Sequence, residues 1–102
     1  MPKKISFRVK SLGREAPVVE VDTAAQALYV YFQRGAKVAR TVVQSQWPLV
    51  AVDLDRKGAV VGVEACGVRE FTLSPLLGKA RVAIPARLLS AARYFPTPAR
   101  AV

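Results

Sequence analysis

The chain has no histidine, a single cysteine and few acidic residues. Without histidine, the commonest general base and the commonest activator of a nucleophile are missing. Seven carboxylates leave few acid–base pairs, so the composition argues against an enzyme. Cys66 has no second cysteine to pair with, which excludes an internal disulfide and fits a reducing cytoplasm. We expect Cys66 to be a small apolar strand residue rather than a nucleophile.

Long apolar runs are missing as well. No run approaches the ~20 residues that a membrane-spanning helix needs. The first ten residues, MPKKISFRVK, have the basic start of a signal peptide but no apolar region after it, so export is not expected. The segment QRGAKVAR lacks the spacing of a phosphate-binding loop. The sequence therefore predicts a cytoplasmic protein that needs no cofactor and no membrane.

What the chain has in excess is apolar and basic residues. At 102 residues, of which 52% are apolar, it has room for one domain (1–102) with one modest core, and apolar surface to spare for a partner chain. Sixteen Lys and Arg against seven Asp and Glu give a net charge of +9, which favours acidic partners such as nucleic acid. The cations are spread evenly along the chain, which is also typical of an ordinary solvated surface.

Alternation of apolar and polar residues dominates as far as about residue 66 and predicts short strands. They cover 5–9, 18–22, 27–33, 38–43, 49–55 and 59–66. Tight turns join them, so neighbours should pair antiparallel as a meander, with a return at Gly35 between 27–33 and 38–43.

After residue 73 the alternating pattern gives way to helix signals. Ser74, Pro75 and Gly78 predict one or two helical turns, with Ser74 as the N-cap. The segment 86–95 has an amphipathic pattern that ends at Pro96. The predicted fold is α+β: an antiparallel β-meander of four to six short strands, with one C-terminal amphipathic helix, about 86–95, packed on one face.

The stretch DLDRKGAVVGVE, residues 53–64, has the spacing of a calcium-binding EF-hand loop. Lys57 stands where an oxygen ligand belongs, and the flanking segments are strand-like instead of helical. We therefore interpret it as a hairpin turn without metal. Asp53 and Asp55 would cap backbone N–H groups, and Gly58 would adopt a positive φ.

Glu64 needs its own explanation. Alternation places it on one strand face with Val60, Gly62 and Cys66, where it would be partly buried. A carboxylate there needs a cationic partner from a neighbouring strand or chain. A functional acid is the alternative, and both stay open.

Two blocks carry a resemblance. VEVDTAAQALYVYF followed by DLDRKGAVVGVE resembles the signature of a family of small uncharacterised bacterial and archaeal proteins, domain of unknown function twenty-two eighty-three. The likeness spans roughly residues 17–66 and leaves the basic extension 67–102 outside; it departs at Gln26, where members commonly have Asp. It implies a compact antiparallel β-unit and no activity, and some members look like partners in toxin–antitoxin-type gene pairs. The motif residues are Asp22, Leu28, Tyr29, Asp53, Asp55, Gly58, Gly62 and Glu64.

The leading functional hypothesis is protein–protein association without catalysis, as a homodimer or as the partner of another small protein. Several strands are apolar on both faces, and one helix can cover only one of them. The second face must meet the N-terminal segment around Phe7 or another chain. The candidate interface residues are Tyr29, Tyr31 and Trp47.

The alternative is a nucleic-acid-binding protein that uses its basic surface. Aromatic residues interleave with Arg34, Lys37 and Arg40, and sheet faces of that composition can stack bases. No sequence motif of a known RNA-binding fold accompanies them.

Overall fold

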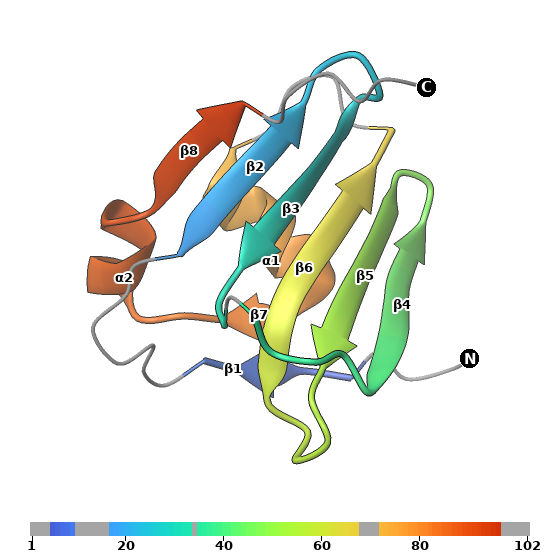
Figure 1. Cartoon of the computed structure of the whole chain (residues 1–102), viewed down its shortest axis with the longest axis vertical. Coiled ribbons are helices and arrows are strands. Elements are labelled where there is room, and N and C mark those ends of the chain that lie inside the picture. The colour runs from blue at the N-terminus through green and yellow to red at the C-terminus, as the bar shows by residue number, and fades with distance from the viewer. Residues whose placement is uncertain (1–4, 10–16, 34, 68–71, 97–102) are drawn as a thin grey trace.

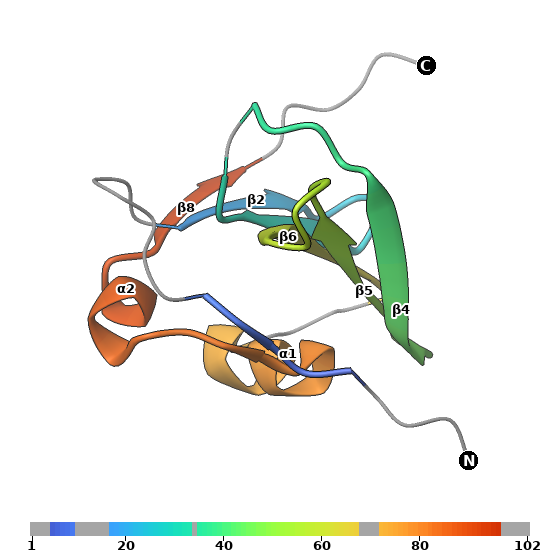
Figure 2. The ribbon, with the colours of Figure 1, turned by 90° about the horizontal axis from the view of Figure 1, so that it is seen from below.

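The computed structural model describes residues 5–9, 17–33, 35–67 and 72–96. They form a six-stranded sheet with a layer of short helices and strands on one of its faces (Figure 1, Figure 2). The sheet consists of β2 (Val18–Asp22), β3 (Ala27–Tyr31), β4 (Arg40–Gln46), β5 (Leu49–Leu54), β6 (Val60–Cys66) and β8 (Arg93–Pro96). The second layer consists of β1 (Phe7–Arg8), α1 (Leu73–Ala80), β7 (Val82–Ala83) and α2 (Ala86–Ser90). The predicted α+β class, with a mainly antiparallel sheet, is confirmed.

The strand order differs from a simple meander. It runs β4-β5-β6-β3-β2-β8, so β3 pairs with β6, and β4 lies at an edge (Figure 1). The predicted return at Gly35 from β3 directly onto the next strand is wrong, although Gly35 does have a positive φ of 79°. Residues 27–33 instead continue along β6, where the backbone N–H of Phe32 donates to Val61 O at 2.8 Å. Strand β6 is largely apolar and therefore needs an apolar strand on each side of it in the sheet. Local turn signals do not specify which strands these are.

The predicted helix 86–95 is also wrong in its second half. Helix α2 ends at Ser90, and Arg93–Pro96 form the edge strand β8, which pairs parallel to β2. The N–H of Arg93 donates to Pro17 O at 2.9 Å. Tyr94 and Phe95 favour strands, and Pro96 cannot continue a helix, so the open edge of β2 is the better partner for this segment.

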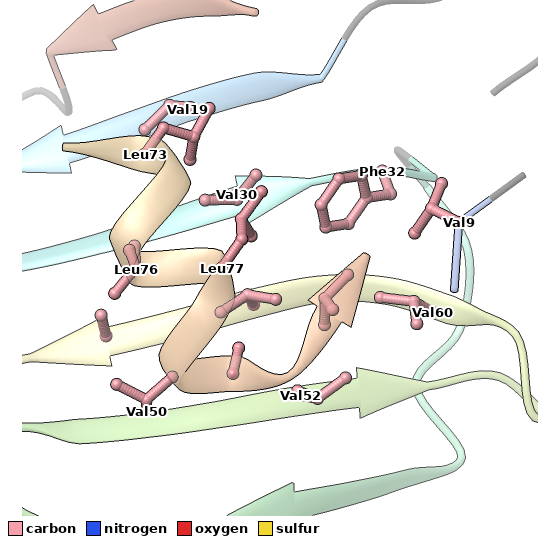
Figure 3. Close-up of a cluster of buried hydrophobic side chains, with 14 of the residues drawn as sticks. Val9, Val19, Val30, Phe32, Val50, Val52, Val60, Leu73, Leu76 and Leu77 are labelled. Atoms are coloured by element: carbon pink, nitrogen blue, oxygen red, sulfur yellow. The ribbon is translucent and has the colours of Figure 1, made fainter. Parts of the chain in front are cut away.

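The hydrophobic core lies between the sheet and α1. Val30, Val50, Val52 and Val63 are fully buried on the sheet side. The helix contributes the buried residues Leu73, Leu76, Leu77 and Ala80 (Figure 3). Each fully buried leucine is worth about 1.5–3 kcal/mol relative to an exposed one. The segment 67–102, which the family resemblance leaves out, thus supplies one side of the core.

Helix α1 begins two residues earlier than predicted, at Leu73. Thr72 is at the N-cap position, without a side-chain capping bond, and Ser74 lies inside the helix. The helix ends at Ala80, and its C-cap residue, Arg81, has a positive φ of 58°. It is this helix, rather than the one at 86–95, that covers most of the sheet face.

The N-terminal segment lies on the same side as α1. Strand β1 pairs parallel to β7, and Phe7 packs against the edge of the core (Figure 2). Two alternatives were predicted for the second face, the segment around Phe7 or another chain. The first is wrong, and the second stays a prediction. Gln44 on β4 connects this layer to the sheet, because its Nε2 donates to Ile5 O and, at 3.0 Å, to Ala80 O.

No helix in the described ranges has the length and apolar character to cross a bilayer.

Candidate functional site

The surface of the sheet opposite α1, here called the outer face, holds most of the predicted site residues. Among the described residues, no helix and no other strand lies over it (Figure 2). Strand register places on it Glu20, Asp22, Tyr29, Tyr31, Thr41, Val43, Leu49, Ala51, Asp53, Gly62, Glu64, Cys66, Arg93 and Phe95.

A hydrogen-bonded link crosses this face from β3 to β4. The hydroxyl of Tyr29 donates to Asp53 Oδ2 at 2.7 Å, and the hydroxyl of Thr41 donates to Asp53 Oδ1. Strand β6 lies between Tyr29 and Asp53, and the ring passes over Gly62. A Cβ at Gly62 would lie 2.3 Å from the Tyr29 ring, so only glycine leaves room for it. Tyr29, Gly62 and Asp53 therefore act as one structural unit.

The electrostatics of this unit make it a poor acid or base. Burial, followed by donation of the hydroxyl to Asp53, raises the pKa of Tyr29 well above its ordinary value. The hydroxyl stays protonated at neutral pH and keeps donating. Asp53 is 9% exposed, and both of its oxygens accept a hydrogen bond. These two hydrogen bonds stabilise the buried carboxylate, which would otherwise be costly to remove from water.

Beside Tyr29 the outer face is hollowed. A cavity of about 280 Å³ is lined by Glu20, Asp22, Tyr29, Tyr31 and Glu64, with the small residues Ala25 and Ala27. The rings of Tyr29 and Tyr31 lie 4.5 Å apart, tilted by 51°. Aromatic faces and carboxylates thus line the same hollow.

Glu64 lies half-buried in this hollow. No described cation forms an ion pair with it, and its Oε1 accepts only the weak donation of the Cys66 thiol at 3.7 Å. Burial and the nearby Glu64 raise the pKa of Cys66, so the thiol stays protonated. The prediction that Val60 shares this face is wrong. A register shift between Asp53 and Leu54 turns Val60 to the core.

Charge is segregated between the outer face and the rest of the molecule. Four carboxylates lie on it: Glu20, Asp22, Asp53 and Glu64. Asp55 is the one carboxylate that the described ranges place elsewhere. Among the described strands, only β8 brings a cation to this face, Arg93, whose guanidinium lies 5.9 Å from the Phe95 ring. A chain of net charge +9 therefore presents an acidic sheet face.

The turn between β5 and β6 confirms the hairpin interpretation of residues 53–64. Asp55 Oδ1 accepts the N–H groups of Lys57 and Ala59, each at 2.9 Å, and Gly58 has a φ of 84°. The Ala59 bond, more than the Lys57 one, lowers the pKa of Asp55. The expectation that Asp53 also caps the turn is wrong, because its side chain lies on the outer face. The described ranges contain no group of His, Cys, Asp or Glu that could hold a metal ion.

A second surface runs along the free side of β4, here called the β4 edge. It comprises Arg40–Gln46 together with Ile5, Val38 and Trp47. Hydrogen bonds to the backbone position the flanking residues, since Ile5 O accepts from Gln44 Nε2 and the N–H of Ala39 donates to Leu54 O at 2.7 Å. Trp47, in the turn that joins β4 to β5, is 88% exposed. A large aromatic residue this exposed is typical of a surface that binds protein.

The structure separates residues that the sequence grouped. Tyr29 and Tyr31 both lie on β3, whereas Trp47 lies in the turn between β4 and β5, two to three strand spacings or about 10–14 Å away. Lys37 and Arg40 are exposed near the start of β4, apart from the tyrosines, and Arg34 lies outside the described residues. Tyr29 and Tyr31 thus share a face with four carboxylates and, among the described strands, with one cation, Arg93. Sequence reasoning missed Glu20 and Thr41; alternation within 18–22 would have placed Glu20 beside Asp22.

No family model matches the chain, and neither a curated protein nor a solved structure matches it. The family resemblance of residues 17–66 therefore stays a prediction. The structure gives a physical reason for the residue type at several positions of this motif. Tyr29, Asp53 and Gly62 require one another on the outer face, while Asp55 and Gly58 form the turn.

Proposed function

We propose that the protein acts by association with a second copy of itself through the β4 edge, without catalysis. The observation that carries this proposal is the location of the exposed apolar residues. Of the six large hydrophobic residues that are exposed in the described ranges, four lie at this edge: Ile5, Val38, Val43 and Trp47. The other two, Tyr94 and Phe95, lie on β8 at the opposite side of the sheet.

The β4 edge suits pairing with its own copy. In a two-fold dimer the same residues must face each other in both directions. Antiparallel pairing centred on Val43 places Trp47 of one copy opposite Ala39 of the other, beside the exposed Val38. It also places Arg40 opposite the neutral Gln46, so no like charges meet. The same register thus buries the apolar residues at both ends of the strand.

The bulge in β4 limits how much backbone hydrogen bonding between the two copies can stabilise such a dimer. The register shifts between Val43 and Ser45, and bulges of this kind interrupt a regular ladder. Side-chain burial must therefore supply most of the free energy. Burying one tryptophan removes about 150–250 Å² from water, which is worth about 4–6 kcal/mol. Two tryptophans per dimer offset an association cost on the order of 4–15 kcal/mol.

The outer face is the less suitable seam for a two-fold dimer. Pairing it with itself would bring Glu20, Asp22 and Glu64 of one copy toward the same carboxylates of the other, and like charges that lose water repel strongly. The same carboxylates disfavour base stacking on Tyr29 and Tyr31, since nucleic acid would bring phosphates to an acidic surface.

Mass and fluorescence together test the proposal. Light scattering on a sizing column should give about twice the 11.1 kDa chain mass at micromolar concentration. Trp47 is the only tryptophan, so its emission should shift to longer wavelength on dilution, as the dimer dissociates. The substitution Trp47→Glu should give a monomer at all concentrations.

The matched control is Phe95→Glu, the same kind of change on an exposed aromatic residue at the opposite edge. It should leave the mass of the dimer unchanged. A wild-type chain that stays monomeric at several hundred micromolar would contradict the proposal. So would a dimer that Phe95→Glu dissociates and Trp47→Glu does not.

A further inference from the structure

The outer face is a distinct surface whose charge is opposite to that of the chain that carries it. Asp22 and Glu64 form no ion pair within the described residues, although the chain has sixteen Lys and Arg. Asp22 Oδ1 accepts the N–H of Ala25 at 3.0 Å, and Asp22 also lines the hollow. Half-buried carboxylates beside aromatic rings gain most when a cation reaches them.

The chemistry of the lining selects one kind of ligand. The rings of Tyr29 and Tyr31 line the hollow, and the carboxylates of Asp22 and Glu64 supply hydrogen-bond acceptors. A guanidinium group stacks on an aromatic ring and donates to a carboxylate in the same plane, which an ammonium group does less well. A cavity of about 280 Å³ has room for one or two such side chains. Phosphates and acidic peptides would be repelled.

We propose that the outer face docks an arginine-bearing basic segment of another protein. The arginine side chains enter the hollow between Tyr31 and Glu64, and the segment lies across β2, β3 and β6. Charge complementarity favours this partner: the outer face holds four of the five described carboxylates, and no described helix or other strand lies over it. This docking uses a different surface from the β4 edge and does not depend on it.

The net charge of the chain makes binding of a cationic peptide a demanding test. A protein of charge +9 repels cations at long range, so non-specific attraction cannot account for an association. The experiment is fluorescence anisotropy of a labelled peptide of alternating arginine and glycine with the full chain. Matched peptides carry lysine or glutamate instead of arginine. We expect the arginine peptide to bind at low ionic strength, the lysine peptide to bind more weakly, and the glutamate peptide not to bind.

Substitutions then locate the site. The double variant Asp22→Asn, Glu64→Gln should weaken the binding of the arginine peptide by about tenfold or more, because both carboxylates line the hollow. Asp55→Asn removes one carboxylate on the β5–β6 turn and should change the affinity by less than about twofold. Trp47→Glu should dissociate the dimer yet keep peptide binding, which separates this proposal from the preceding one.

Several results would overturn the proposal. One is the absence of binding even at low ionic strength. Another is an equal loss in Asp55→Asn, which would mean that overall charge decides the affinity. A third is a loss of dimer mass in the double variant Asp22→Asn, Glu64→Gln, which would identify a second copy of this chain as the occupant. Circular dichroism of each variant establishes that a loss of binding is not a loss of folding.

Discussion

The two faces of the sheet are made by the same strands and differ completely in chemistry. On β3, Leu28 and Val30 point to the core, while Tyr29 and Tyr31 point to the outer face. The inner face is mainly aliphatic, with Phe32 as an aromatic member of the core, and is buried beneath α1 (Figure 3). The outer face is aromatic and acidic, and it has no described covering element. The strand period of two therefore lets one segment supply both a stabilising surface and a recognising surface.

The difference also lies in how each face is held together. Non-directional burial stabilises the inner face, and its free energy scales with the apolar area removed from water. The outer face depends on directed bonds, such as the donation of Tyr29 and Thr41 to Asp53. Loss of an inner residue leaves a cavity, whereas loss of an outer donor leaves an unpaired carboxylate oxygen. The two faces should thus respond differently to substitution.

The same truncation on the two faces should give the largest contrast. Leu77 is 2% exposed on α1 and packs on the inner face, so Leu77→Ala should lower the free energy of unfolding by about 2–5 kcal/mol. Leu49 is half-buried on the outer face. Leu49→Ala should cost less than about half as much, because water can fill the space it leaves. Urea denaturation of both variants measures the difference, and equal costs would mean that the outer face is also a closed core.

How far the sequence predicts these faces varies by element. Alternation located β2, β3, β5 and β6 and the turn at Asp55, because local period and turn chemistry determine them. It did not give the pairing of β3 with β6, which depends on contacts between residues more than thirty positions apart. The helical pattern at 86–95 failed where Arg93–Pro96 met the open edge of β2, a tertiary partner that local propensity does not contain.

The candidate site was partly predictable for the same reason. Tyr29 and Tyr31 are adjacent in one strand, so their shared face follows from sequence alone. The proximity of Tyr29 to Asp53 depends on the strand order and on the missing side chain at Gly62. Trp47 was grouped with the tyrosines because all three are aromatic. Only the topology places it at the β4 edge instead.

A substitution at Gly62 should break the outer face without touching the inner one. The added methyl of Gly62→Ala would displace the Tyr29 ring and end its bond to Asp53, at a cost of about 1–3 kcal/mol. In a Tyr29→Ala background the same change meets no ring. There it should be neutral or slightly stabilising, since alanine is less flexible than glycine in a strand. Urea denaturation of the wild type, the two single variants and the double variant gives the coupling free energy between the two positions. Additive changes in the free energy of unfolding would mean that Gly62 is not needed to accommodate the Tyr29 ring.

High pH should weaken the outer face by a smaller amount and leave the inner face unaffected. Burial and the bond to Asp53 raise the folded-state pKa of Tyr29 above its ordinary value of 10.0. The neutral hydroxyl therefore stabilises the fold fully below pH 10. That contribution is lost as the pH rises above 10, because the unfolded chain then releases the proton while the folded chain holds it. Tyr29→Phe removes this term but keeps the ring over Gly62. Its Tm should be lower than that of the wild type at pH 8, and the gap should narrow between about pH 9 and pH 11. Lysine deprotonation affects both proteins alike, so two melting curves that stay parallel over this range would mean that Tyr29 ionises as freely in the folded chain as in the unfolded one.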